Sequence, residues 1–167
     1  IKKIIILKNL NIFVRLKYFI KAYLIIKSCK NMNEFLNFNI NNVDIGKAVN
    51  DNYLRFSGMG TTDEFNRSIY VNLSKSLLIY YQIDKYFKKY KIVASVQSEK
   101  QFIPGAIIFQ TALTNGINVY SRVGPDTGFS VKKYSNINER YTSRGRFSKK
   151  IYNLIDQNIR KEAIEIG

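Results

Sequence analysis

The sequence predicts an α/β fold in which helices flank a parallel sheet and a basic amphipathic helix precedes it. Residues 91–96 and 117–123 are short β-branched runs of the kind that form buried parallel strands. Residues 103–113 between them have the length and apolar content of a crossover helix, which ends at an Asn-Gly stop signal. A strand, a helix and a strand within about 33 residues make a βαβ unit, so we expect the two strands to lie parallel.

Helical spacing of apolar residues predicts further helices on both sides of this unit. A long helix is expected over residues 64–90, after a Thr-Asp-Glu capping signal, and a shorter one over residues 43–55. A final helix is expected over residues 147–164. The Asn-rich segment 31–42 is typical of turns or an irregular connection.

Residues 2–30 are apolar and basic and contain no acidic residue. Charged residues interrupt them too often for a bilayer-spanning helix, which needs about 20 consecutive apolar residues, or for a signal peptide. On a helical wheel the apolar face is flanked by cations, which is typical of a helix packed on its domain and also of a helix lying at a membrane surface. Both interpretations stay open.

We therefore divide the chain into two parts. Residues 1–42 hold the basic amphipathic helix and the Asn-rich connection, and residues 43–167 form the α/β domain. The chain starts with Ile1 and stops within an apolar-polar pattern, so we expect this domain to be truncated at both ends.

The composition points to an anionic partner. The chain has 27 Lys and Arg against 12 Asp and Glu, a formal net charge of +15, which suits nucleic acid, a phosphorylated ligand or an inner-leaflet membrane surface. A codon bias toward A/T, which enriches Ile, Lys and Asn, is an alternative cause of this charge. With one cysteine, Cys29, and no histidine, the sequence excludes an internal disulfide, a histidine metal site and a Ser-His triad. We expect no metal and no cofactor.

Few residues in the sequence are candidates for a ligand-binding or catalytic role. The loop at the carboxyl end of the second predicted strand holds Gly124, Asp126 and Gly128, at the edge where open α/β sheets bind ligands. Its glycines allow the backbone to approach a phosphate or sugar, although the spacing matches neither a Walker loop nor a dinucleotide motif and also suits an ordinary turn. Carboxylates that are candidates for a general base are Glu99 and Asp126 near strand ends and Asp44 and Asp51 beside the short helix. Each has a surface or capping role as the alternative.

Two main stretches and a weaker third carry a resemblance to a known family. Residues 44–55 read DIGKAVNDNYLR, and residues 98–120 contain SEKQFIPG, then AL, then GINVY. The third comprises the loop at Gly124 and the region of Tyr134, Glu139 and Phe147. They resemble bacterial surface or capsular polysaccharide biosynthesis proteins related to GT-B glycosyltransferases, which share the patterns Ile-Gly-Asp-Leu-Ile-Tyr-Asp-x-Tyr-Leu-Arg and Ser-His-x-x-Tyr-Ile-x-x-Gly. The first pattern is matched at Gly46, Asp51, Tyr53, Leu54 and Arg55. The second departs from the family where Glu99 replaces His and Phe102 replaces Tyr.

The resemblance implies the Rossmann-like N-terminal half of a GT-B enzyme, with the donor bound mainly by a C-terminal half beyond residue 167. It implies transfer of a sugar from a nucleotide-sugar to a saccharide or lipid-linked acceptor, in the cytoplasm or peripherally at the inner membrane face. The base expected for the acceptor hydroxyl is Glu99 or Asp51, and the partner expected for phosphate is Arg55 or Arg122.

The same interpretation requires three segments to line one cleft. They are the segments around Gly46, Glu99 and Gly124, which are far apart in the sequence. Two alternatives remain open. The basic and aromatic run 132–150 suits a non-enzymatic nucleic-acid-binding module or simply a solvated basic face, and the departures from the family patterns suit an inactive remnant of the transferase.

Overall fold

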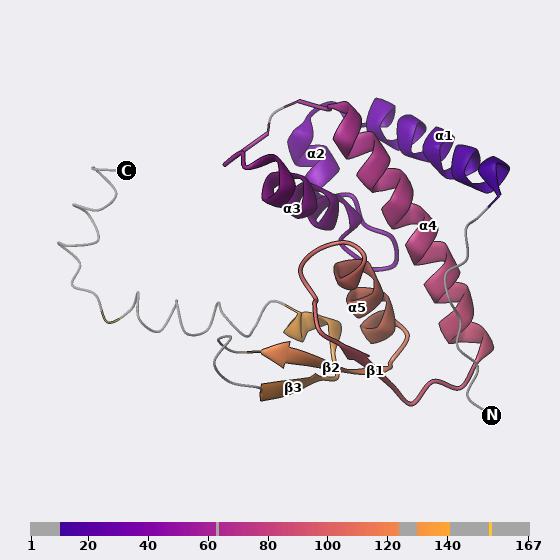
Figure 1. The fold of residues 1–167 in the computed structure, drawn as a ribbon, viewed down its shortest axis with the longest axis vertical. Helices are drawn as coiled ribbons and strands as arrows, with labels where there is room; N and C mark the ends of the chain where they lie inside the picture. Colours follow the sequence, from indigo (N-terminus) through magenta and orange to yellow (C-terminus); the bar gives the residue numbers. More distant parts are fainter. Residues whose placement is uncertain (1–10, 63, 124–129, 141–153, 155–167) are drawn as a thin grey trace.

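The computed structural model describes residues 11–62, 64–123, 130–140 and 154, and all structural statements below concern these residues. Within them the chain forms a group of helices followed by a small sheet (Figure 1). The elements in order are α1 (Ile12–Ser28), α2 (Met32–Leu36), α3 (Ile45–Ser57), α4 (Arg67–Lys89), β1 (Ala94–Gln97), α5 (Gly105–Thr114), β2 (Asn118–Val123), β3 (Ser130–Tyr134) and the 3-10 helix η1 (Ile137–Glu139).

The predicted βαβ unit is confirmed, and the all-parallel sheet is not. β1 pairs with β2 in parallel, with Ala94 opposite Asn118, and α5 is the crossover helix. A third strand, β3, pairs antiparallel with β2, so the sheet is mixed, in the order β1-β2-β3. Only residues 124–129 join β2 to β3, which is too short for the crossover of a dozen or so residues that a parallel neighbour requires. Of the predicted helix over 147–164, only Leu154 lies within the described residues.

Asparagines set the boundaries of the helices. The side chain of Asn31 accepts a hydrogen bond from the backbone N–H of Glu34, and the Glu34 carboxylate accepts one from Lys30 N–H, so α2 starts with a reciprocal cap inside the segment that we expected to be irregular. Asn66 caps α4 through the backbone N–H groups of Ser68 and Ile69. This explains why α4 begins three residues after the predicted start.

α5 separates two halves of the hydrophobic core. Ala106 and Ile107 join a cluster made by α1 to α4, whereas Phe109 packs on the sheet, with its ring centroid 5.1 Å from that of Tyr134. The α1 residues Ala22 and Ile26 belong to the helical cluster, and α1 packs along α4 (Figure 1). None of the described helices is long and apolar enough to span a bilayer.

Gly46, near the start of α3, is a contact point between helices. Its backbone N–H donates to the Phe38 carbonyl, and a Cβ placed on it would collide with the Phe35 carbonyl oxygen. Only glycine lets α3 approach the end of α2 this closely, which fixes the orientation of the helix that carries the site described below.

We expect Gly46→Ala to destabilise the fold by about 3 kcal/mol, because the backbones of α2 and α3 must move apart to accommodate the methyl group. The measurement is urea denaturation followed by circular dichroism. Gly60→Ala is the control, since no atom lies within 4 Å of a Cβ there. Equal stability of the two variants would contradict this packing argument.

Candidate functional site

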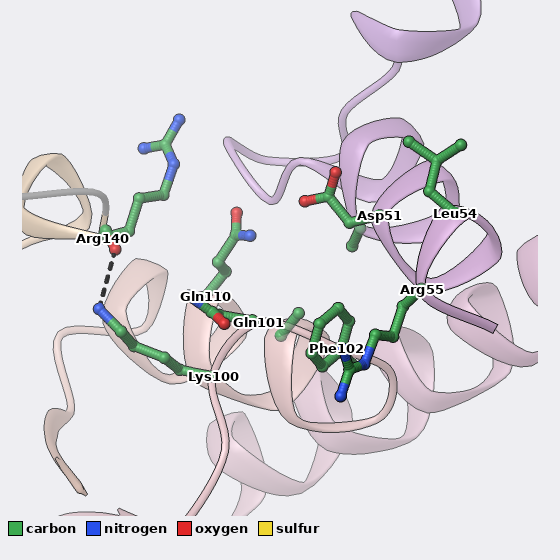
Figure 2. A pocket seen from close by; sticks show the side chains of 10 residues that line it. Asp51, Leu54, Arg55, Lys100, Gln101, Phe102, Gln110 and Arg140 are labelled. Carbon is green, nitrogen blue, oxygen red and sulfur yellow. Dashed lines mark hydrogen bonds between the residues drawn. The ribbon is translucent and has the colours of Figure 1, made fainter. Parts of the chain in front are cut away.

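A pocket of about 520 Å³ lies between α3, the loop that follows β1, α5 and the end of the described chain after η1 (Figure 2). Its polar lining comes from segments far apart in the sequence and consists of Asp51, Arg55, Lys100, Gln101, Gln110 and Arg140. Three of these side chains are cations and one is a carboxylate, so the lining is basic overall.

α3 forms one wall of the pocket through its helical period. Asp51 and Arg55 are one turn apart and both face the pocket, whereas Ile45 and Val49 on the opposite side of the helix are fully buried in the core. The buried Asn52 accepts a hydrogen bond from Ile103 N–H at 3.3 Å, which ties the loop before α5 to this helix. The amphipathic pattern of α3 therefore places two charged groups along the pocket.

Lys100 forms the opposite wall and joins three segments. Its Nζ donates to the Tyr134 hydroxyl at 2.9 Å and to the Arg140 carbonyl at 3.3 Å, and it lies 4.5 Å from the centroid of the Tyr134 ring (Figure 2 shows the Arg140 bond). These contacts hold the loop after β1 against β3 and η1. They also direct the ammonium group to one end of the pocket.

A polar chain runs beneath the pocket from α5 to η1. Gln110, only 5% exposed within the otherwise apolar α5, accepts a hydrogen bond from Asp44 N–H at 2.8 Å. The Asp44 carboxylate in turn accepts two from Arg140, Nε at 3.0 Å and Nη2 at 2.9 Å. The Arg140 guanidinium also donates to the Ile137 carbonyl at 3.1 Å. Because Asp44 offsets the charge of Arg140, this pair holds the pocket together more than it attracts a ligand.

Asp51 and Arg55 are arranged differently. Asp51 is exposed at the edge of the pocket, and partial removal of water by the neighbouring atoms raises the pKa of its carboxyl, while Lys47 on the same helix lowers that pKa by a smaller amount. The guanidinium of Arg55 lies 5.8 Å from the centroid of the Phe102 ring. Neither side chain makes an ion pair or a hydrogen bond with another described residue.

The structure separates the residues that the sequence singled out. Asp51 and Arg55 line the pocket, whereas Gly46 is buried against α2 and does not. The Glu99 carboxylate folds back to accept the backbone N–H of Lys100 at 2.7 Å and that of Gln101, and it is not among the lining residues. Arg122 is exposed on β2, opposite Val131 of β3.

The loop residues Gly124, Asp126 and Gly128 lie outside the described part of the chain, so only two of the three segments expected to converge can be placed. Those two, α3 and the loop after β1, do meet at the pocket.

Sequence reasoning missed Lys100, Gln110 and Arg140. Gln110 had a usable signal, because a single amide within a strongly apolar predicted helix must find a partner in the core. Arg140 lies in the basic run 132–150, but no local pattern indicates its pairing with Asp44, 96 positions away. Among the described residues no group of acidic or cysteine side chains could hold a metal ion.

Comparison with protein-family models, with curated proteins and with solved structures found no match.

The raised pKa of Asp51 predicts the sign of a pH effect. The folded chain favours the protonated carboxyl of Asp51. The free energy of unfolding therefore falls as the pH rises from the unfolded-state pKa, about 3.9 for an ordinary aspartate, through the higher pKa of the folded state. We expect Asp51→Asn to be more stable than the parent at pH 7, with a difference that disappears below about pH 3.9. Thermal denaturation across this range measures it. A variant less stable than the parent at pH 7 would show that the carboxylate is instead stabilised by its surroundings.

The Asp44–Arg140 pair should be strongly coupled, because the two side chains are only 13% and 19% exposed. Either Asp44→Asn or Arg140→Gln alone should cost about 1–3 kcal/mol, and the double variant clearly less than the sum. A double-mutant cycle by urea denaturation measures the coupling. The Asp84–Lys88 pair on α4 is the control, because its lysine side chain is 60% exposed, and its expected coupling is about 0.5 kcal/mol or less. Similar couplings in the two cycles would refute the structural role of the Asp44–Arg140 pair.

Proposed function

We propose that this chain is a glycosyltransferase-like protein of surface polysaccharide biosynthesis, and that its pocket binds a phosphate-bearing or otherwise acidic sugar substrate. One observation carries the proposal. The two stretches that resemble polysaccharide biosynthesis proteins are separated by more than 40 residues, yet both contribute to the same pocket, the first through Asp51 and Arg55 and the second through Lys100, Gln101 and Phe102.

The charge of the pocket supports a phosphate-bearing ligand. Arg55 presents a planar guanidinium that can form two parallel hydrogen bonds to phosphate oxygens, and Lys100 adds a second cation from across the pocket. The amide side chains of Gln101 and Gln110 offer donors and acceptors of the kind that sugar hydroxyls require. A lining of cations, amides and one aromatic ring thus suits a phosphosugar.

Asp51 is the base in this proposal. The acceptor hydroxyl attacks the anomeric carbon of the donor and a glycosidic C–O bond forms. The bond from that carbon to the phosphate oxygen breaks with its electron pair, and the nucleoside diphosphate leaves. The carboxylate of Asp51 receives the hydroxyl proton, and its raised pKa makes it a stronger proton acceptor than an ordinary aspartate. The geometry favours Asp51 over Glu99, because the Glu99 carboxylate already accepts two backbone N–H groups.

Binding of a panel of phosphorylated monosaccharides and nucleotide-sugars, measured by titration calorimetry, tests the proposal. At least one member should bind, and Arg55→Gln should weaken it about tenfold or more by removing a charge-assisted hydrogen-bond pair. Asp51→Asn should leave this binding within a few-fold while abolishing any sugar transfer, measured as nucleoside diphosphate release.

Arg122→Gln is the matched control, since Arg122 is an exposed arginine that does not line the pocket. Absence of binding across the panel would refute the proposal, as would equal losses in Arg55→Gln and Arg122→Gln. Steeply salt-dependent binding of generic nucleic acid in place of sugar phosphates would point to the nucleic-acid-binding alternative.

A further inference from the structure

α1 has two apolar faces, and the structure buries only one of them. The inner face carries Ala22 and Ile26, which are buried against α4 and its neighbours. The outer face exposes a stripe of large apolar side chains at helical spacing, for example Phe13 at 73% and Leu16 at 54%. The outer stripe consists of Ile12, Phe13, Leu16, Phe19, Ile20, Tyr23 and Leu24.

The spacing makes this stripe a continuous surface. Positions 12, 16, 19, 20 and 23 fall on adjacent turns of the helix, and Phe13 and Leu24 widen the same side. An isolated exposed leucine is ordinary, but seven large apolar side chains on one face of a 17-residue helix expose a contiguous patch of the kind that marks an interaction site.

Cations border the stripe on both sides. At 100° per residue, Arg15 lies beside one edge and Lys17 beside the other, and both are exposed. Lys27, in the last turn, ends the stripe with a third exposed cation. No acidic residue lies in α1, and Glu34 is the first in the whole chain. An apolar stripe with a cation at each edge and a third at its end matches the chemistry of an anionic bilayer, where acyl chains contact the stripe and lipid phosphates pair with the cations.

We propose that the outer face of α1 binds the surface of an anionic lipid bilayer. The charge pattern favours this occupant over a second copy of the chain. Two stripes packed on each other would bring the bordering Arg15 and Lys17 side chains of both copies together with no carboxylate of α1 to offset them.

The absence of tryptophan from the sequence provides a direct test. Leu16→Trp places a single indole in the centre of the stripe, and Phe56→Trp places one at a 78% exposed site on α3. Titration with vesicles of phosphatidylcholine and phosphatidylglycerol should shift the emission of the Leu16→Trp chain to shorter wavelength and leave that of the Phe56→Trp chain unchanged. Pure phosphatidylcholine should give a clearly weaker response.

Removing the bordering cations separates the electrostatic contribution to membrane binding from the apolar one. Adding Arg15→Gln and Lys17→Gln to Leu16→Trp should weaken partitioning to the anionic vesicles about tenfold or more, with helix content unchanged by circular dichroism. The matched control carries Lys85→Gln and Lys89→Gln, two exposed cations on α4, and should bind as before.

Three outcomes would overturn the proposal. Emission of Leu16→Trp that is unaffected by anionic vesicles would show that the stripe does not meet lipid. Emission already at short wavelength in dilute protein would show that the chain covers its own stripe. A blue shift that grows with protein concentration and without vesicles would assign the stripe to a second copy.

Discussion

The burial of α5 is the constraint on which the remaining structure depends. Seven of its ten residues are buried, because one side faces the helical cluster and the other faces the sheet. A helix enclosed in this way tolerates polar groups only where they are satisfied, and Thr111 donates to the Ile107 carbonyl while Gln110 accepts the Asp44 N–H. The helix also starts at Gly105, where a Cβ atom would collide with the carbonyl oxygen of Glu99. The loop from β1 therefore folds tightly over the start of α5, beside the pocket.

The pocket follows from that burial. Gln110 anchors the start of α3 through Asp44, and Asp44 in turn holds Arg140, so the α3 wall and the far wall are both positioned from the centre of the molecule. Lys100 completes the link to the sheet through Tyr134. Asp51 and Arg55, by contrast, project from α3 without a hydrogen-bond or ion-pair partner among the described residues, and Arg55 lies beside the Phe102 ring. Polar groups that hydrogen-bond to one another thus hold two further charged side chains in place at the pocket. A preorganised binding site requires this kind of support.

Local patterns were enough to predict the βαβ unit, the long helix α4 and the placement of Asp51 and Arg55 on one helix. They failed where distant residues decide. β3 was missed because its alternation places Lys132 on the same face of the sheet as the buried Tyr134, where a local pattern predicts an apolar residue. In the fold the Lys132 ammonium lies 4.9 Å from the centroid of the Tyr134 ring. The role expected for Glu99 rested on its position after a strand, which says nothing of a carboxylate turning back to its own loop. Arg140 entered the site through a pairing across 96 residues that no periodicity encodes.

The two proposed surfaces constrain one another through α4. α1 packs on α4, and α4 packs on α3 and α5, which border the pocket, so α4 lies between the apolar stripe and the pocket (Figure 1). Packed helices are about 8–10 Å apart, so a bilayer in contact with the outer face of α1 is about two helix layers from the pocket. At such a separation, an acceptor that already carries several sugars, or one free in solution, reaches the pocket more readily than a sugar attached directly to a lipid phosphate. If both proposals hold, the substrate is therefore an extended or soluble saccharide, and the membrane contact concentrates the protein near the site of synthesis without presenting the acceptor itself.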